Sequence, residues 1–303
     1  MRRQEPGAHQ APAEAGLEVM RAIADQPDLA RQLGEIRRVR RLPGLSNRVY
    51  DVETATGRYV LRVSLPQTDA LVDRSVECHN LHAAAAAGLS PAPVFADPRS
   101  GLVVLPFVEV SAGPPSPAVL GGALRRLHGE ITDYRGRRDP RDWAVRLMRS
   151  VTGHPELHEK AENTVRLLNR VQDRAQLDRH PFVPSHWDVS DGNCLTLTDG
   201  VLLIDWEYSA LGPRSWDLAY AALEFGYDEP SEAAFLAAYT GSGSEISELA
   251  GEVRAMKVIC DAISALWALT QQAGGNDAAD FQSLADHRAE RARWQLERLS
   301  AGS

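Results

Sequence analysis

Three oxygen-bearing side chains follow one another at short spacing in the second half of the chain. Asp188 and Asn193 belong to the segment HWDVSDGN, residues 186–193, and Asp205 begins the segment DWE a short distance later. Phosphoryl transfer from a nucleotide needs a carboxylate that orients the acceptor hydroxyl and takes its proton, and it needs hard oxygen ligands for Mg²⁺. These residue types at this spacing suit that chemistry, provided that the fold brings them together.

A β-hairpin is expected to bring the third side chain back to the first two. Two runs typical of strands, Cys194–Leu197 and Val201–Ile204, flank the turn sequence Thr-Asp-Gly at 198–200. The hairpin would begin directly after Asn193 and end at Asp205. An Asp or Asn in such a loop is commonly only a cap or turn former. The prediction that the three side chains act together therefore depends on the position of the hairpin between Asn193 and Asp205. His186 is expected to hold the loop by packing or hydrogen bonding.

The composition narrows the ways in which the chain can hold phosphate. The 303 residues carry a formal charge of −8, and lysine occurs only at Lys160 and Lys257. The first half therefore holds no P-loop and no strand lysine, so any phosphate there must be bound by arginine, backbone N–H groups or metal. Net acidity argues against a nucleic-acid partner or an anionic membrane surface and favours a cationic ligand.

The remaining composition predicts a protein of the cytoplasm. The three cysteines are far apart and form no C-x-x-C pair, which indicates reduced thiols. The N-terminus shows no signal peptide, and the longest apolar stretch is too short to span or insert into a membrane. The oligomeric state is expected to be monomer or homodimer.

The pattern of elements predicts an α+β fold of two lobes. Residues 1–15 are expected to form a disordered tail, residues 16–109 a small β-rich N-terminal lobe, and residues 110–303 a larger helical lobe with the catalytic loop and acceptor pocket. Helices are expected from Leu17, broken near Pro27, and over 69–87, 118–128, 142–148, 157–177, 215–225, 232–239, 246–272 and 278–299. Further strands are expected over 39–42, 48–53, 58–63, 93–96 and 102–108.

Several segments together resemble the choline and ethanolamine kinases, within the wider group of aminoglycoside phosphotransferases and protein-kinase-like folds. They are HWDVSDGN, LIDWEYSALGPRSWDLA, GLSNRVYDVET, YVLRV, DRSVE and LWALTQ. The resemblance covers most of the chain and implies Asp188 as catalytic base, Asn193 and Asp205 as Mg²⁺ ligands, and ATP as phosphoryl donor. It also implies a nucleotide site in which Arg62 replaces the usual lysine and pairs with Glu77, with further contacts from Ser46, Asn47, Phe107, Val108 and Glu109.

The resemblance implies an acceptor pocket for a small cationic alcohol. Aromatic faces and carboxylates both stabilise a desolvated ammonium. The residues implied to line the pocket are Tyr208, Glu224, Trp267, Glu207 and Trp187. Two departures affect this pocket: Trp187 stands where that family usually has a small polar residue, and Ser264 stands where relatives often have an aromatic residue.

The first hypothesis is therefore an ATP- and Mg²⁺-dependent kinase that phosphorylates the hydroxyl of choline, ethanolamine or a related amino alcohol. The second is an aminoglycoside or other antibiotic phosphotransferase, for which a larger and more acidic acceptor cleft is expected. The third is a pseudokinase that binds nucleotide without turnover, although all three catalytic positions are filled.

Overall fold

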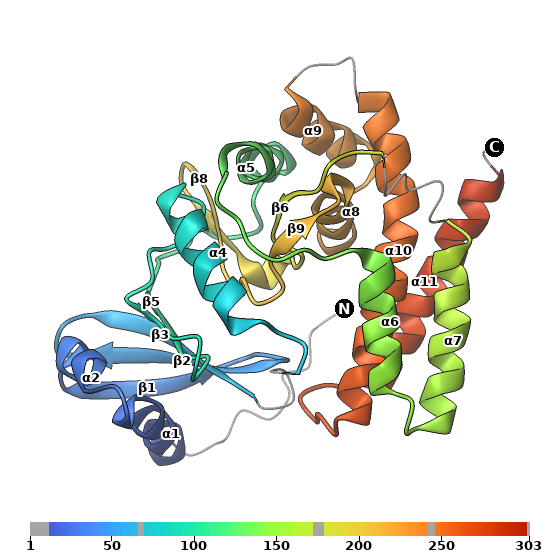
Figure 1. Cartoon of the computed structure of the whole chain (residues 1–303). Helices are drawn as coiled ribbons and strands as arrows, with labels where there is room; N and C mark the ends of the chain where they lie inside the picture. Colours follow the sequence, from blue (N-terminus) through green and yellow to red (C-terminus); the bar gives the residue numbers. More distant parts are fainter. Residues whose placement is uncertain (1–11, 66–69, 172–178, 242–245, 302–303) are drawn as a thin grey trace. The chain divides into compact units, whose positions relative to one another are not determined.

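The computed structural model describes residues 12–65, 70–171, 179–241 and 246–301, and the chain divides into two compact units (Figure 1). The first unit comprises Met1–Arg74 and Ala92–Val108, and the second comprises Ser75–Pro91 and Glu109–Ser303. The predicted fold class is confirmed, because the first unit is built on an antiparallel sheet and the second is mainly helical. The second unit resumes at Glu109, beside the predicted boundary, but it also takes the helix that had been expected in the N-terminal lobe.

The first unit is a five-stranded antiparallel sheet with two helices on one face. The strand order is β1-β2-β3-β5-β4, and the strands are β1 (Ile36–Leu42), β2 (Asn47–Thr54), β3 (Arg58–Ser64), β4 (Phe95–Ala96) and β5 (Val103–Pro106). Alternate residues on β2, such as Tyr50 and Val52, point to one face and are fully buried there against α1 (Pro12–Ala24) and α2 (Pro27–Leu33). This core fixes the register of β2 and β3, in which Arg62 pairs with Val49.

The second unit contains the helices and the short strands that carry the catalytic loop. Its elements are α4 (Arg74–Ala86, from Ser75), α5 (Pro117–Glu130), α6 (Pro140–Ser150), α7 (Pro155–Asn169), β6 (Val183–Ser185), the 3₁₀ turn η1 (Asp191–Asn193), β7 (Cys194–Leu197), β8 (Gly200–Leu203), β9 (Ala210–Gly212), α8 (Arg214–Glu224), α9 (Glu229–Thr240), α10 (Ile246–Ala273) and α11 (Phe281–Ala301). Helix α10 is the centre of the unit, since it packs against α6, α7, α8, α9 and α11 and is buried along most of its length (Figure 1).

Two strands were missed by the sequence prediction. β6 and β9 are three residues each and pair antiparallel, with Ser185 opposite Ala210. They are too short to show alternation, and Pro184 and Gly212 are residues that strands usually avoid. Gly212 is required here for space, because a Cβ at this position would come within 2.6 Å of Trp187 Nε1. The pair holds the start of the catalytic loop against the segment that follows Asp205.

Several boundaries differ from the prediction. Residues 1–11 of the predicted tail lie outside the described residues, but α1 already begins at Pro12, and Ala15 is buried in the core. Helix α4 begins at Arg74, later than expected, and α7 ends at Asn169, earlier than the expected 177. Residues 172–177 of that expected helix lie outside the described residues. Cys78, Cys194 and Cys260 are free, as predicted, and all three are buried. Within the described ranges, no helix is both long and apolar enough to cross a membrane.

Candidate active site

The catalytic loop leaves β6 through a backbone conformation that is rare for a side chain of this size. Trp187 has φ 72°, in the left-handed region, which costs about 1–3 kcal/mol unless the surroundings enforce it. Its ring stacks on Trp216 with centroids 4.2 Å apart, and the Trp216 indole N–H donates to the Trp187 carbonyl oxygen at 3.1 Å. These contacts bury Trp187 to 4% exposure and hold the strained residue in place.

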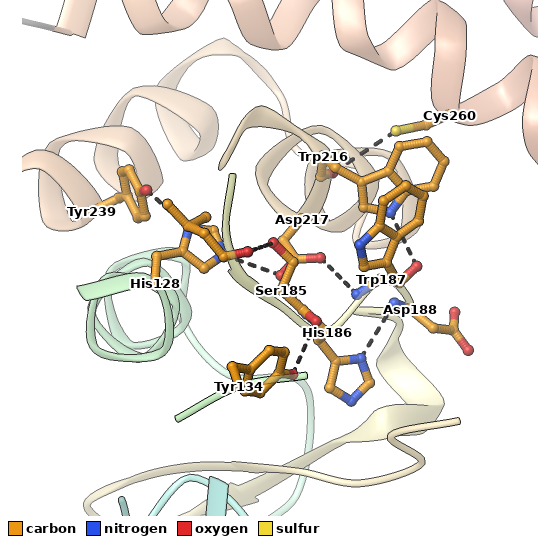
Figure 2. Close-up of polar contacts among 11 residues, drawn as sticks. His128, Tyr134, Ser185, His186, Trp187, Asp188, Trp216, Asp217, Tyr239 and Cys260 are labelled. Atoms are coloured by element: carbon orange, nitrogen blue, oxygen red, sulfur yellow. Dashed lines mark hydrogen bonds and ion pairs between the residues drawn. The ribbon is translucent and has the colours of Figure 1, made fainter. Parts of the chain in front are cut away.

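Asp217 on α8 fixes the two residues that precede Asp188, the predicted base. Its carboxylate accepts the backbone N–H of His186 on Oδ2 and that of Trp187 on Oδ1, both at 2.8 Å (Figure 2). His128 on α5 lies 3.1 Å from the same carboxylate and 2.9 Å from the Tyr239 hydroxyl. Figure 2 shows Asp217 between His128 and the loop, with the Asp188 carboxylate directed away from this network. Asp217 is fully buried, so these bonds replace all of its hydration.

His186 has the structural role predicted from the sequence. Its Nδ1 lies 3.3 Å from the backbone nitrogen of Asp188, which donates, and its Nε2 lies 3.0 Å from the carbonyl oxygen of Ile204. Burial lowers the pKa of His186 to about 4, so the ring is neutral and carries its proton on Nε2. The ring therefore links Ile204, which precedes Asp205, to the backbone of Asp188, the predicted base.

Asp188 and Asn193 are in direct contact. The Asn193 amide nitrogen Nδ2 donates to the Asp188 carboxylate at 2.8 Å and to the Asp188 carbonyl oxygen at 3.0 Å. Burial, together with the charges of Glu224 and Glu207, raises the pKa of Asp188 to about 6, although hydrogen bonds from Tyr220 and Asn193 oppose the shift. A carboxylate in such surroundings takes up a proton more readily than an exposed one, as a general base must.

The hairpin formed by β7 and β8 returns the chain to the catalytic loop, as predicted. The backbone N–H of Ile204 donates to the Asn193 carbonyl oxygen at 3.0 Å, and Asp205 follows directly with φ 64°. The orientation of the Asn193 amide suits a metal ligand, because Nδ2 makes both bonds to Asp188 and the amide oxygen is left for a cation. An amide oxygen and a carboxylate on adjoining segments are the hard ligands that Mg²⁺ prefers.

Two of the predicted acceptor residues lie together. The Trp267 indole N–H on α10 donates to the Tyr208 hydroxyl at 3.1 Å, and the Tyr208 ring meets Trp143 edge to face. Glu224, at the end of α8, forms an ion pair with Arg288 of α11 at 2.6 Å. Arg288 also contacts Asp261, which Arg291 binds through two nitrogens. The predicted carboxylate therefore already has a cation from the chain beside it.

Glu207 and Trp187, the other two predicted acceptor residues, are both buried. The charge of Glu207 raises the pKa of both Asp188 and Arg138, so this carboxylate lies near both groups. Ser264, on α10, is less buried than its neighbours Ile263 and Ala265.

The predicted nucleotide residues are divided between the two units. Ser46, Asn47, Arg62, Phe107 and Val108 belong to the first unit, and Glu77 and Glu109 belong to the second. Arg62 lies on β3 with β2 and β5 on either side, and Asn47 begins β2 opposite Ser64. The Phe107 backbone N–H donates to the Arg58 carbonyl oxygen, and the Arg58 guanidinium stacks on its ring. The pairing of Arg62 with Glu77 and the contacts to nucleotide stay predictions.

Sequence reasoning missed the residues that reach the loop, or the acidic side chains near it, from distant parts of the chain. Asp217 lies in the segment LIDWEYSALGPRSWDLA, but the sequence predicts no supporting role for it or for His128, Tyr220, Arg138 and Arg288. The sequence offers one signal for Asp217, which is followed by Leu218 and Ala219 on a helix. An acid among apolar residues is rarely buried without a partner, so a buried Asp217 would be expected to bind another polar group.

The arrangement of these residues indicates a class of protein. A loop that brings an aspartate and an asparagine into contact, and a hairpin that returns a second aspartate, occur here in a chain that also has a small antiparallel sheet. This is the arrangement of kinase-like phosphotransferases. The chain belongs to the phosphotransferase enzyme family, whose model matches residues 38–256. No curated protein sequence matches the chain.

Solved structures confirm the expected resemblance. A choline/ethanolamine kinase family protein from Mesorhizobium loti is 25% identical, with a TM-score of 0.72 over 94% of this chain and 97% of that one. An ethanolamine kinase from Plasmodium vivax has a TM-score of 0.75 at 16% identity, over 96% and 95% of the two chains. A spectinomycin phosphotransferase solved with ADP and spectinomycin has a TM-score of 0.58 at 14% identity, over 89% and 98%.

Proposed function

We propose that this protein transfers a phosphoryl group from ATP to the hydroxyl of a small cationic amino alcohol, with ethanolamine and choline as the first candidates. The observation that carries the proposal is the contact between Asp188 and Asn193 inside a loop that Asp217 and His186 hold from behind. Such rigid support is what a reaction that depends on positioning requires.

In this proposal Asp188 is the catalytic base. Its carboxylate accepts a hydrogen bond from the acceptor hydroxyl, directs the oxygen at the γ-phosphorus, and takes the proton as the new P–O bond forms. The bond from the γ-phosphorus to the bridging oxygen of the β-phosphate breaks in the same transfer, and ADP leaves with that oxygen. Asn193 fixes one carboxylate oxygen at 2.8 Å, so the carboxylate cannot rotate away from the acceptor. Tyr220, whose pKa is raised well above its usual value by burial, stays protonated and donates to the same carboxylate.

The Asn193 and Asp205 side chains would hold Mg²⁺. When bound, the metal ion neutralises charge on the phosphates of the nucleotide. Arg62 would hold phosphate oxygens through its planar fork of donors, with Glu77 setting its direction. Ser46 and Asn47 would cover the phosphates, and residues 107–109 would contact the base through backbone groups.

Replacement of Arg62 tests the nucleotide site. We expect Arg62→Ala to lower kcat/KM for ATP by about 10²-fold, because one charged donor to the phosphates is lost. Steady-state kinetics with varied ATP measures the effect. Arg38→Ala is the matched control, since Arg38 is an exposed arginine of the same sheet that pairs with Glu53 at 3.2 Å. Unchanged kinetics in Arg62→Ala would remove this residue from the nucleotide site.

The acceptor class is tested by ADP release in the presence of Mg²⁺ and a panel of acceptors. We expect release to depend on an amino alcohol and to be slower with aminoglycosides. An aminoglycoside phosphotransferase is the second candidate, supported by the TM-score of 0.58 with the spectinomycin enzyme. Resistance conferred on an antibiotic-sensitive host, together with no turnover of amino alcohols, would favour this second candidate.

We further propose that the protein acts in the cytoplasm as a monomer or homodimer. Three buried free cysteines support a reducing compartment, because none of them is paired as in secreted proteins.

A further inference from the structure

The acceptor end of the site contains an arginine enclosed by aromatic rings. The Arg138 guanidinium carbon lies 3.9 Å from the Trp143 ring centroid, 5.4 Å from that of Trp187 and 5.5 Å from that of Tyr208. We call Arg138 and these three rings the guanidinium cage. One ring belongs to the residue before Asp188, and another to the tyrosine that accepts from Trp267.

Arg138 is not held in the cage by hydrogen bonds. Its Nε and Nη1 are buried and have no hydrogen-bond partner among the residues that the structure describes. Burial lowers the pKa of Arg138 to about 10, so the side chain is still charged at neutral pH. The ring faces and the charge of Glu207 therefore compensate for its lost hydration. The three rings thus surround a cation as an ammonium-binding cage does, but the cation is the Arg138 side chain of the protein itself.

Primary and quaternary ammonium groups are recognised differently. A trimethylammonium group has no N–H to donate, so its binding depends mainly on aromatic faces. A primary ammonium donates up to three hydrogen bonds and is held well by a carboxylate. Glu224 offers such a carboxylate near Asp188, because its side chain is 19% exposed although its Oε1 contacts Arg288.

We propose that Arg138 excludes quaternary ammonium groups and makes the protein specific for alcohols that carry a primary ammonium group. This inference rests on the proposed function and narrows its acceptor class. Arg138 is a specificity-determining residue in this account, because it occupies the ring faces that a trimethylammonium group needs. The primary ammonium is held by Glu224, and its hydroxyl is presented to Asp188.

The kinetic test compares choline with ethanolamine in ATP-dependent ADP release. We expect the wild type to have a kcat/KM for ethanolamine about tenfold or more above that for choline. Arg138→Ala opens the cage and should raise the choline-to-ethanolamine ratio by about tenfold. Arg146→Ala is the control, since Arg146 is an exposed arginine at 5.4 Å from the same Trp143 ring and should leave the ratio unchanged. A wild type that prefers choline, or an unchanged ratio in Arg138→Ala, overturns the inference.

A binding measurement separates this inference from the proposed function. Tetramethylammonium has no hydroxyl, so its binding by calorimetry reports the cage without turnover. We expect millimolar tetramethylammonium to give no binding heat with the wild type and a measurable binding heat with Arg138→Ala. The near-ultraviolet circular dichroism of the variant must match that of the wild type, which shows that the variant is folded. Binding of tetramethylammonium to the wild type overturns the inference, and this measurement does not depend on the folding of any variant. Absence of ADP release with both amino alcohols overturns the proposed function, while the calorimetric result still decides whether Arg138 closes the cage.

Discussion

Asp188→Asn is expected to lower kcat by about 10²–10⁴-fold while ADP binding stays as in the wild type. The substitution removes the group that takes the acceptor proton but keeps the size and shape of the side chain. The loop is expected to hold, because Asn193 still donates to the carbonyl oxygen of residue 188 and His186 still accepts its backbone N–H. Acceptor-dependent ADP release gives the rate, and calorimetry with ADP gives the affinity.

Asp191→Asn is the matched control for this change. Asp191 is an exposed acid of the same loop, so its loss changes the local charge equally without touching Asp188. The control is expected to keep wild-type activity. Equal rates in the wild type and Asp188→Asn, together with normal ADP binding in both, would contradict the role of Asp188 and favour a pseudokinase.

Asp217→Asn is expected to lower both stability and activity, although Asp217 touches no substrate. An amide offers one acceptor oxygen where the carboxylate offers two, so one buried N–H of His186 or Trp187 would face an NH₂ group. The loss of such a charge-assisted bond and the unsatisfied donor cost about 3 kcal/mol of the free energy of unfolding. Since Trp187 precedes Asp188, the shift of the loop should also lower kcat by about 10²-fold.

Chemical denaturation and steady-state kinetics measure the two effects of Asp217→Asn. Asp228→Asn serves as control, because Asp228 caps α9 at the surface and asparagine caps a helix as well as aspartate does. Wild-type stability and kcat in Asp217→Asn would show that the carboxylate does not hold the loop.

The parts of the site that lie close together in the sequence were predictable. The loop from His186 to Asn193 and the hairpin that leads to Asp205 follow from local turn chemistry and residue type, and the structure brings Asp188 and Asn193 into contact. The sheet of the first unit followed from alternation and from the turns that separate its strands. Local patterns determine these features, so a single sequence is enough to find them.

The supports from distant helices were not predictable in the same way. The contact of Asp217 with His128 joins α8 to α5, and the pair of Glu224 with Arg288 joins α8 to α11. Nothing in the spacing of these residues indicates which helices will pack together. The prediction treated Glu224 as open to a substrate cation, whereas tertiary packing has brought an arginine to one of its oxygens.

Phosphorus-31 NMR of the reaction tests the central claim most directly. Protein, ATP, Mg²⁺ and ethanolamine are incubated together, and the account predicts a new phosphomonoester signal that grows with the loss of the ATP γ-phosphate signal. The signal should not form without ethanolamine, and it should be nearly absent with Asp188→Asn. Conversion of ATP to ADP and inorganic phosphate alone, at the same rate in the wild type and Asp188→Asn, would contradict the account.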